Sequence, residues 1–245
     1  MAAVQWFPGH MAKAKRLIRG SLPLIDVVIE VLDARAPRSS SNPLLRSLTQ
    51  PKQRLILLNK DDLADTKATK LWISQFHRDG QIVPLRVSGK QARGLDAIPK
   101  ACLNLFRDAS WRSRRPVRAL ITGIPNVGKS SIINGLSGRN RAETGAAPGL
   151  TRNLRRIPIN SRFELFDTPG LLLHKFEDPL TGLILAALGA VKETILPDEE
   201  LTARLLSYLA WRYPEALATR YGLKEIPQPP HSLTEVVGRN RGCLM

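Results

Sequence analysis

Residues 121–131 read ITGIPNVGKSS, and their types and spacing suit the binding of a nucleoside triphosphate. The pattern G-x-x-x-x-G-K-[ST] is completed by Gly123, Gly128, Lys129 and Ser130. An apolar run at 117–121 precedes the pattern and a helix-compatible stretch at 130–136 follows it. In such a loop the backbone N–H groups and the helix N-terminus bind phosphate, the lysine reaches the β- and γ-phosphates, and the serine hydroxyl holds Mg²⁺. A glycine-rich turn that binds nothing is the plain alternative, and the complete, correctly flanked match argues against it.

Two further polar segments follow strand-like runs and fit the recognition of a guanine base. The residues concerned are Asn59, Lys60 and Asp62, then Ser88, Gly89 and Lys90. The Asp62 carboxylate can accept hydrogen bonds from the N1–H and the 2-amino group of guanine, neither of which adenine offers. The Lys60 stem can lie on the base, Asn59 can join its segment to the phosphate loop, and the later segment can present a backbone N–H to guanine O6. Polar turns after strands are common, but beside a complete phosphate loop these segments predict GTP rather than ATP.

The segment DTPG at 167–170 places a carboxylate and a backbone N–H where Mg²⁺ and the γ-phosphate are expected. Asp167 is expected to hold Mg²⁺ through water, and the Gly170 N–H to meet the γ-phosphate. Thr151 in PGLTR is our choice for the hydroxyl that completes the metal site, with Thr144 as the competing candidate. The expected Mg²⁺ ligands are therefore Ser130, Thr151 and Asp167. The remaining residues expected at the nucleotide are Asn126, Val127, Gly128, Lys129 and Ser131.

Hydrophobic periodicity predicts the elements that position these segments. Strands are expected at 26–32, 54–58, 81–87, 117–121, 154–159 and 163–166. Helices are expected at 11–22, 42–48, 67–78, 95–106, 130–136, 179–193, 198–213 and 215–221. The alternation of strands and helices predicts an α/β domain with a mostly parallel sheet flanked by helices, followed by a small all-helical C-terminal domain. The expected boundaries are 1–175, with a basic amphipathic helix near the start, and 176–245.

The order of the segments along the chain is unusual. In ordinary GTPases the phosphate loop precedes the guanine segments, whereas here the segments at 59–62 and 88–90 precede the loop at 123–130. Circular permutation preserves a three-dimensional sheet while it moves the chain ends. The residues from Lys175 onward then follow directly on the segment that responds to the γ-phosphate. The nucleotide state is therefore expected to reposition the helical tail.

The composition favours a polyanionic partner. The chain has 245 residues, with 37 Lys and Arg against 21 Asp and Glu, which gives a net charge of +16. RNA and an anionic membrane both suit that excess, and a merely basic enzyme is the plain alternative. The two cysteines, Cys102 and Cys243, support neither a disulfide framework nor a zinc site. No apolar run of membrane-spanning length or secretory signal core is seen, so we expect a cytoplasmic protein, and an organelle remains an alternative.

With these motifs in hand, the sequence resembles the circularly permuted GTPases of the ribosome biogenesis GTPase A (YlqF) family. The segments that carry the resemblance are WFPGHMAKA, DARAP, NKDD, GIPNVGKSS, PGLTR and DTPGLLLHKFED. They span nearly the whole chain, and WFPGHM together with the permuted order is highly specific. The resemblance implies a GTPase that assists late assembly of the large ribosomal subunit, binds rRNA, and hydrolyses GTP faster on the ribosomal particle.

The resemblance also implies two catalytic features. Leu171 stands where many GTPases place a water-orienting glutamine, and the family role of helping to position the attacking water falls to His10 beside the catalytic Lys129. Asn126 is the residue that similar potassium-dependent GTPases use to coordinate K⁺. A structural turn histidine and a loop-stabilising asparagine are the plain alternatives for these two residues.

Other expectations concern partners and the end of the chain. Basic stretches at 13–19, 112–118 and 152–156, with Arg239 and Arg241, are the candidate rRNA contacts. The family implies a further helical segment after Met245, so the C-terminal domain is expected to be truncated or naturally short. An alternative function is a GTP-gated, RNA-binding assembly placeholder in which hydrolysis is incidental. The oligomeric state is left open.

Overall fold

The computed structural model describes residues 8–50, 52–78, 82–138, 155–168, 178–190, 198–227 and 230–243. The chain divides into two compact units, residues 1–185 and residues 186–245. Each unit is described by itself. The boundary expected between residues 175 and 176 remains a prediction about the domains.

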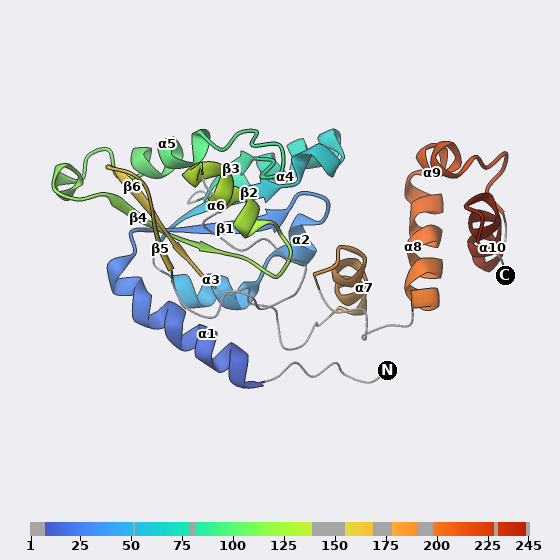
Figure 1. Cartoon of the computed structure of the whole chain (residues 1–245), viewed down its shortest axis with the longest axis horizontal. Coiled ribbons are helices and arrows are strands. Elements are labelled where there is room, and N and C mark those ends of the chain that lie inside the picture. Colours follow the sequence, from blue (N-terminus) through green and yellow to red (C-terminus); the bar gives the residue numbers. More distant parts are fainter. Residues whose placement is uncertain are drawn as a thin grey trace. The chain divides into compact units, whose positions relative to one another are not determined.

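A six-stranded sheet forms the centre of the first unit (Figure 1). Its strands are β1 (Val27–Asp33), β2 (Gln53–Asn59), β3 (Ile82–Arg86), β4 (Val117–Thr122), β5 (Arg155–Asn160) and β6 (Phe163–Asp167). The spatial order is β3-β2-β1-β4-β6-β5. All neighbouring pairs are parallel except β5 and β6, which form an antiparallel hairpin. The expected α/β fold with a mostly parallel sheet is confirmed.

Helices flank this sheet on both sides. They are α1 (Pro8–Ser21), α2 (Pro37–Ser40), α3 (Pro43–Thr49), α4 (Thr66–Arg78), α5 (Ala97–Asn104) and α6 (Lys129–Ser137), with short 3₁₀ turns at η1 (Leu22–Leu24), η2 (Asp61–Leu63) and η3 (Ser110–Ser113). Figure 1 shows α1 and α3 on one side of the sheet and α5 on the other. Because helices cover both faces, the central strands β1 and β2 are mostly apolar and buried along nearly their whole length, rather than alternating between apolar and polar residues.

The core follows from the side-chain alternation along the strands. One cluster joins Val28 of β1 and Leu120 of β4 to Ile18 of α1 and Leu45 of α3. On β1 and β2, Leu32, Ile56 and Leu58 form another cluster, against which Trp72, Ile73 and Phe76 of α4 pack. The residues of opposite parity on β1, Val27, Ile29 and Val31, are equally buried. The sheet is therefore fixed from both faces, and its loops extend from a rigid support.

The second unit is helical in all of its described residues outside turns. It contains α8 (Asp198–Arg212), α9 (Pro214–Tyr221) and α10 (Pro230–Asn240), and α7 (Pro179–Ala187) spans the division between the units. Its core is formed by Leu206, Leu217, Leu223 and Leu233. The expected helix at 179–193 ends earlier, at Ala187, and α10 was not expected at all. Within the described residues, no helix has the length and apolar character needed to span a membrane.

Candidate nucleotide-binding site

The carboxyl ends of the parallel strands gather the predicted motifs at one edge of the sheet. Asp33 ends β1, Asn59 ends β2 and Asp167 ends β6, while β4 runs directly into the phosphate loop after Thr122. Asp33 and Asn59 are register partners, as are Ile121 and Asp167. This edge is where open α/β sheets bind ligands, at the point where chain connections diverge on either side of β1 and β4.

The phosphate loop requires two of its glycines. Gly123 and Gly128 have φ angles of +155° and +92°, which side chains rarely adopt. A Cβ atom on Gly123 would lie 2.6 Å from the carbonyl oxygen of Val31, and one on Gly128 would lie 2.3 Å from Nδ2 of Asn59. The loop is therefore packed against β1 and against the guanine segment. α6 starts immediately after Gly128, so its N-terminus faces the loop.

Lys129 is buried at the base of this loop. Its Nζ donates to the carbonyl oxygens of Gly123 and Ile124, each at 3.2 Å. Burial lowers the pKa of the Lys129 ammonium to about 8, although the nearby Asp167 carboxylate acts in the opposite direction. The ammonium group is thus a poorly solvated cation, and an anion at the loop would stabilise it.

Asp167 is the matching buried anion. Its Oδ1 has no hydrogen-bond partner within the described residues. Burial raises its pKa to about 6, opposed by the charge of Lys129, the Thr168 N–H and the charge of Arg155. The Thr168 hydroxyl donates to the carbonyl of Ile121 at 2.9 Å and so fixes the start of the DTPG segment on β4. An unpartnered carboxylate oxygen beside the phosphate loop fits a divalent cation that oxygen ligands would hold.

Asn59 joins three loops through its side chain. Its Nδ2 donates to the carbonyl oxygen of Val127 at 2.6 Å, and its Oδ1 accepts from the Gly89 N–H at 2.9 Å. The expected link between the guanine segment and the phosphate loop is thus present as a hydrogen bond. Since the same side chain also holds the Ser88–Lys90 segment, the three segments are fixed against one another.

Lys60 makes a second connection. Its Nζ donates to the carbonyl oxygen of Asn126 at 2.7 Å. Asp62, the expected guanine acceptor, is partly exposed, and its Oδ2 accepts from Nε2 of Gln91 at 3.4 Å. Asp62 lies in η2, just after Lys60, and Lys129 begins α6, just after the phosphate loop, so both residues adjoin the segments that this hydrogen bond joins. The contact of one nucleotide with both residues remains a prediction.

Three charged residues beside this site were missed from the sequence. Asp33 accepts from Lys60, and Arg35 donates to Asp33. Asp61 accepts from Nε and the terminal nitrogen of Arg86 at 2.8 and 3.1 Å, which links the guanine segment to β3. The segment DARAP at a strand end and the doubled aspartate of NKDD were the available signals, but neither predicts these pairings.

Some expected residues cannot be placed. Thr151 and Gly170 lie outside the described residues, as does the competing candidate Thr144. His10 lies in the first turn of α1, and its side chain is outside the described part. No cluster of three or more His, Cys, Asp or Glu side chains that could hold a metal ion occurs among the described residues. A cation here would therefore need oxygen atoms from the nucleotide as well as from Ser130 and Asp167.

Comparison with known proteins shows the family to which the chain belongs. A family model described as 50S ribosome-binding GTPase matches residues 118–201. The ribosome biogenesis GTPase A of Bacillus cereus is 45% identical over 248 residues, which cover 99% of this chain and 83% of the relative. GNP-bound YlqF from T. maritima aligns with a TM-score of 0.59 at 26% identity, over 94% of each chain. A GDP-bound YlqF structure aligns with a TM-score of 0.57 at 25% identity, over 92% of this chain and 94% of that chain.

These similarities extend over nearly the whole chain. The relative from Bacillus cereus aligns with 99% of it, and the GNP-bound YlqF structure aligns with 94%. The protein is therefore a GTPase, and its chain belongs to the circularly permuted ribosome biogenesis GTPase A (YlqF) family.

Proposed function

We propose that this GTPase assists late assembly of the large ribosomal subunit and that contact with the particle accelerates its hydrolysis of GTP. Membership of the family supports a role in ribosome biogenesis, and the family-model description names the 50S subunit. The observation that carries the nucleotide part is the hydrogen bonding of Asn59 and Lys60 to phosphate-loop carbonyls. The alternative of a placeholder with incidental hydrolysis is not favoured, because the relatives are named as GTPases. The cytoplasm or an organelle is the proposed location.

Different segments would contact the guanine base and the phosphates of the nucleotide. The Asp62 carboxylate would accept from the guanine base and the Lys60 stem would lie on its face. The Gly89 N–H is held by Asn59, so we assign guanine O6 to the Lys90 N–H. The amides at 126–131 would surround the phosphates.

Charge at the reacting phosphate is the second part of the mechanism. Lys129 would move from the carbonyls of Gly123 and Ile124 to the β- and γ-phosphates. Ser130, Thr151 and Asp167 would hold Mg²⁺, which supplies neutralisation of the phosphate oxygens when bound. The Gly170 N–H would contact the γ-phosphate. Since phosphoryl transfer depends on positioning and charge stabilisation, hydrolysis should be slow until the particle orders the loops.

His10 is proposed to position the attacking water. It lies in the first turn of α1, whose later residue Ile18 is anchored in the core. Substitution His10→Ala should lower GTP turnover on ribosomal particles by about a hundredfold, within the range for a positioned general acid–base group. Turnover by the variant at the wild-type rate would remove His10 from the mechanism.

Asn126 is proposed to coordinate K⁺ beside the phosphates. It adopts φ of +58°, an uncommon conformation for a residue with a side chain, and its carbonyl oxygen accepts from Lys60. We expect kcat to be higher in K⁺ than in Na⁺ at equal ionic strength. Equal kcat values in the two salts would rule the ion out.

The rRNA contacts are proposed for basic side chains that have no carboxylate partner within the described part of the chain. Within 112–118, Arg115 pairs with Asp26 and Arg118 pairs with Glu164, which also pairs with Arg156. These arginines chiefly hold the sheet together. In that stretch Arg112 and Arg114 are therefore the better candidates for phosphate contacts, and Arg16 and Arg19 of α1 are similarly available among the described residues.

One experiment tests the function as a whole. The protein is sedimented with large-subunit precursors and with mature subunits, in the presence of GDP or a non-hydrolysable GTP analogue, and GTP turnover is measured with and without the particles. We expect GTP-dependent binding to the precursor, affinity that falls with added salt as counterions are released, and stimulated turnover. Binding that is independent of both nucleotide and salt, without stimulation, would overturn the proposal.

A further inference from the structure

Asp33 is a buried carboxylate at the edge of the nucleotide site, and the functions assigned above do not use it. Its side chain is 2% exposed. Oδ1 accepts from the backbone N–H of Arg35 at 3.1 Å and from its Nε at 2.9 Å, and Oδ2 accepts from the terminal nitrogen of Arg35 at 2.7 Å. Oδ2 also lies 3.0 Å from Nζ of Lys60. The carboxylate is thus fixed by one cation and directed at a second.

The second cation connects two loops. Lys60 Nζ lies between Oδ2 of Asp33 and the carbonyl oxygen of Asn126, at 3.0 and 2.7 Å. Asp33 ends β1, Lys60 follows β2, and Asn126 lies in the phosphate loop after β4. One ammonium group therefore ties together segments from three neighbouring strands, and two of those segments are expected to contact opposite ends of the nucleotide.

Backbone conformation shows that this connection is imposed by its surroundings. Lys60 and Asn126 have φ angles of +60° and +58°, and the third described residue other than glycine with positive φ is Ala92. A residue with a side chain held in this region costs about 1–3 kcal/mol, and it persists when neighbouring contacts fix it. Both ends of the Lys60–Asn126 hydrogen bond thus have strained backbones, and the Asp33 carboxylate is the charged group that holds the bond.

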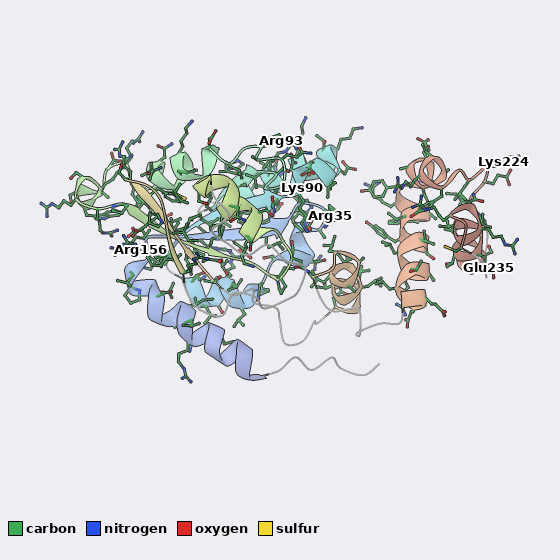
Figure 2. The ribbon with its side chains drawn as sticks, in the orientation of Figure 1. Arg35, Lys90, Arg93, Arg156, Lys224 and Glu235 are labelled. Atoms are coloured by element: carbon green, nitrogen blue, oxygen red, sulfur yellow. The ribbon has the colours of Figure 1, made fainter. Side chains whose placement is uncertain are left out.

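The charge balance supports a permanent ion pair. Burial acts to raise the pKa of Asp33, but hydrogen bonding from Arg35 and the charges of Lys60 and Arg35 outweigh it and leave the pKa below its ordinary value. Asp33 therefore stays ionised throughout the physiological range. Figure 2 labels Arg35, Lys90 and Arg93, and all three lie toward the same end of the sheet.

We propose that Asp33, fixed by Arg35, is a positioning residue for guanine nucleotide binding: it holds the Lys60 ammonium group on the phosphate-loop carbonyl of Asn126. This inference rests on the proposed nucleotide site. Asp33 itself touches no part of the nucleotide. It acts through Lys60, by fixing both the lysine stem that lies against the base and the separation of the guanine segment from the phosphate loop.

A double-mutant cycle tests this dependence. Asp33→Asn keeps the shape of the side chain and removes its charge, while Lys60→Met keeps an apolar stem and removes Nζ. We expect each single variant to bind a fluorescent GDP about tenfold more weakly, and the double variant to bind no more weakly than the weaker single variant. A purely structural role of Asp33 would instead make the two losses multiply, which would overturn the inference.

Asp26→Asn is the matched control. Asp26 precedes the opposite end of β1, is similarly shielded at 10% exposure, and forms two hydrogen bonds of 2.7 and 2.8 Å with Arg115. We expect this variant to lower the melting temperature without changing GDP affinity. Equal losses of affinity in Asp26→Asn and Asp33→Asn would also overturn the inference. Absence of saturable GDP binding by the wild-type protein would overturn the nucleotide site itself, a result distinguishable from failure of the cycle.

Discussion

Replacing Lys129 by methionine is expected to reduce GTP turnover on the particle by about a hundredfold to a thousandfold, while stabilising the nucleotide-free protein. The loss of turnover follows from removing a preorganised positive charge at the transferred phosphate. The gain in stability follows from burial, because the ammonium group contacts two backbone carbonyls and has a pKa lowered from 10.5 to about 8. That difference corresponds to about 3 kcal/mol, so the melting temperature should rise by several degrees.

The pH dependence identifies the cause of this stabilisation. Below pH 8 the lysine is charged in both the folded and the unfolded protein, so the penalty of burial is fully present. Between pH 8 and 10.5 the folded protein loses its proton first, and the penalty disappears. The difference in melting temperature between Lys129→Met and the wild type should therefore shrink across this interval. Thermal unfolding over a pH series measures it, with Lys100→Met, at an exposed lysine of α5, as the control. A constant difference would show that burial of charge is not the cause.

Much of the fold could be predicted from the sequence because the strands are buried on both faces. The run at 26–32 is largely apolar and β-branched, the run at 54–58 is largely leucine and isoleucine, and each is followed by polar residues that carry a motif. Those two signals together locate β1 and β2 to within a residue at each end. α10 was missed because Pro229 and Pro230 favour a loop, although Leu233, Val236 and Val237 have helical spacing.

The ion pairs between charged residues within the site could not be predicted from the sequence. The phosphate loop and the guanine segment each have a local pattern that reflects contacts with one ligand, so their residue types are constrained at fixed spacing. The contact of Asp33 with Lys60 instead joins residues that are 27 positions apart and meet only because β1 and β2 are paired in register. The ion-pair partners of Asp61 were equally hard to predict, because Arg86 lies on β3 and Arg93 lies after it. Sequence patterns locate such charges but do not pair them.

Replacing Gly128 by alanine is expected to weaken GDP binding by about a hundredfold or more. The new Cβ would lie 2.3 Å from Nδ2 of Asn59, at a backbone φ of +92°. Asn59 would have to move, and it would then lose its hydrogen bonds to Val127 and Gly89. Backbone strain and two lost buried hydrogen bonds together amount to about 3 kcal/mol or more, and they separate the guanine segment from the phosphate loop.

Gly138→Ala is the control that separates the steric clash with Asn59 from the backbone strain of a side chain at positive φ. Gly138 follows the same helix, α6, with φ of +60°, and a Cβ placed on it meets nothing within 4 Å. Both variants should therefore lose stability through strained backbone, but only Gly128→Ala should lose affinity for GDP. Calorimetric titration with GDP and thermal unfolding measure the two effects independently. If Gly128→Ala bound GDP as tightly as Gly138→Ala, the contact between Asn59 and the phosphate loop would not be what brings the two halves of the site together.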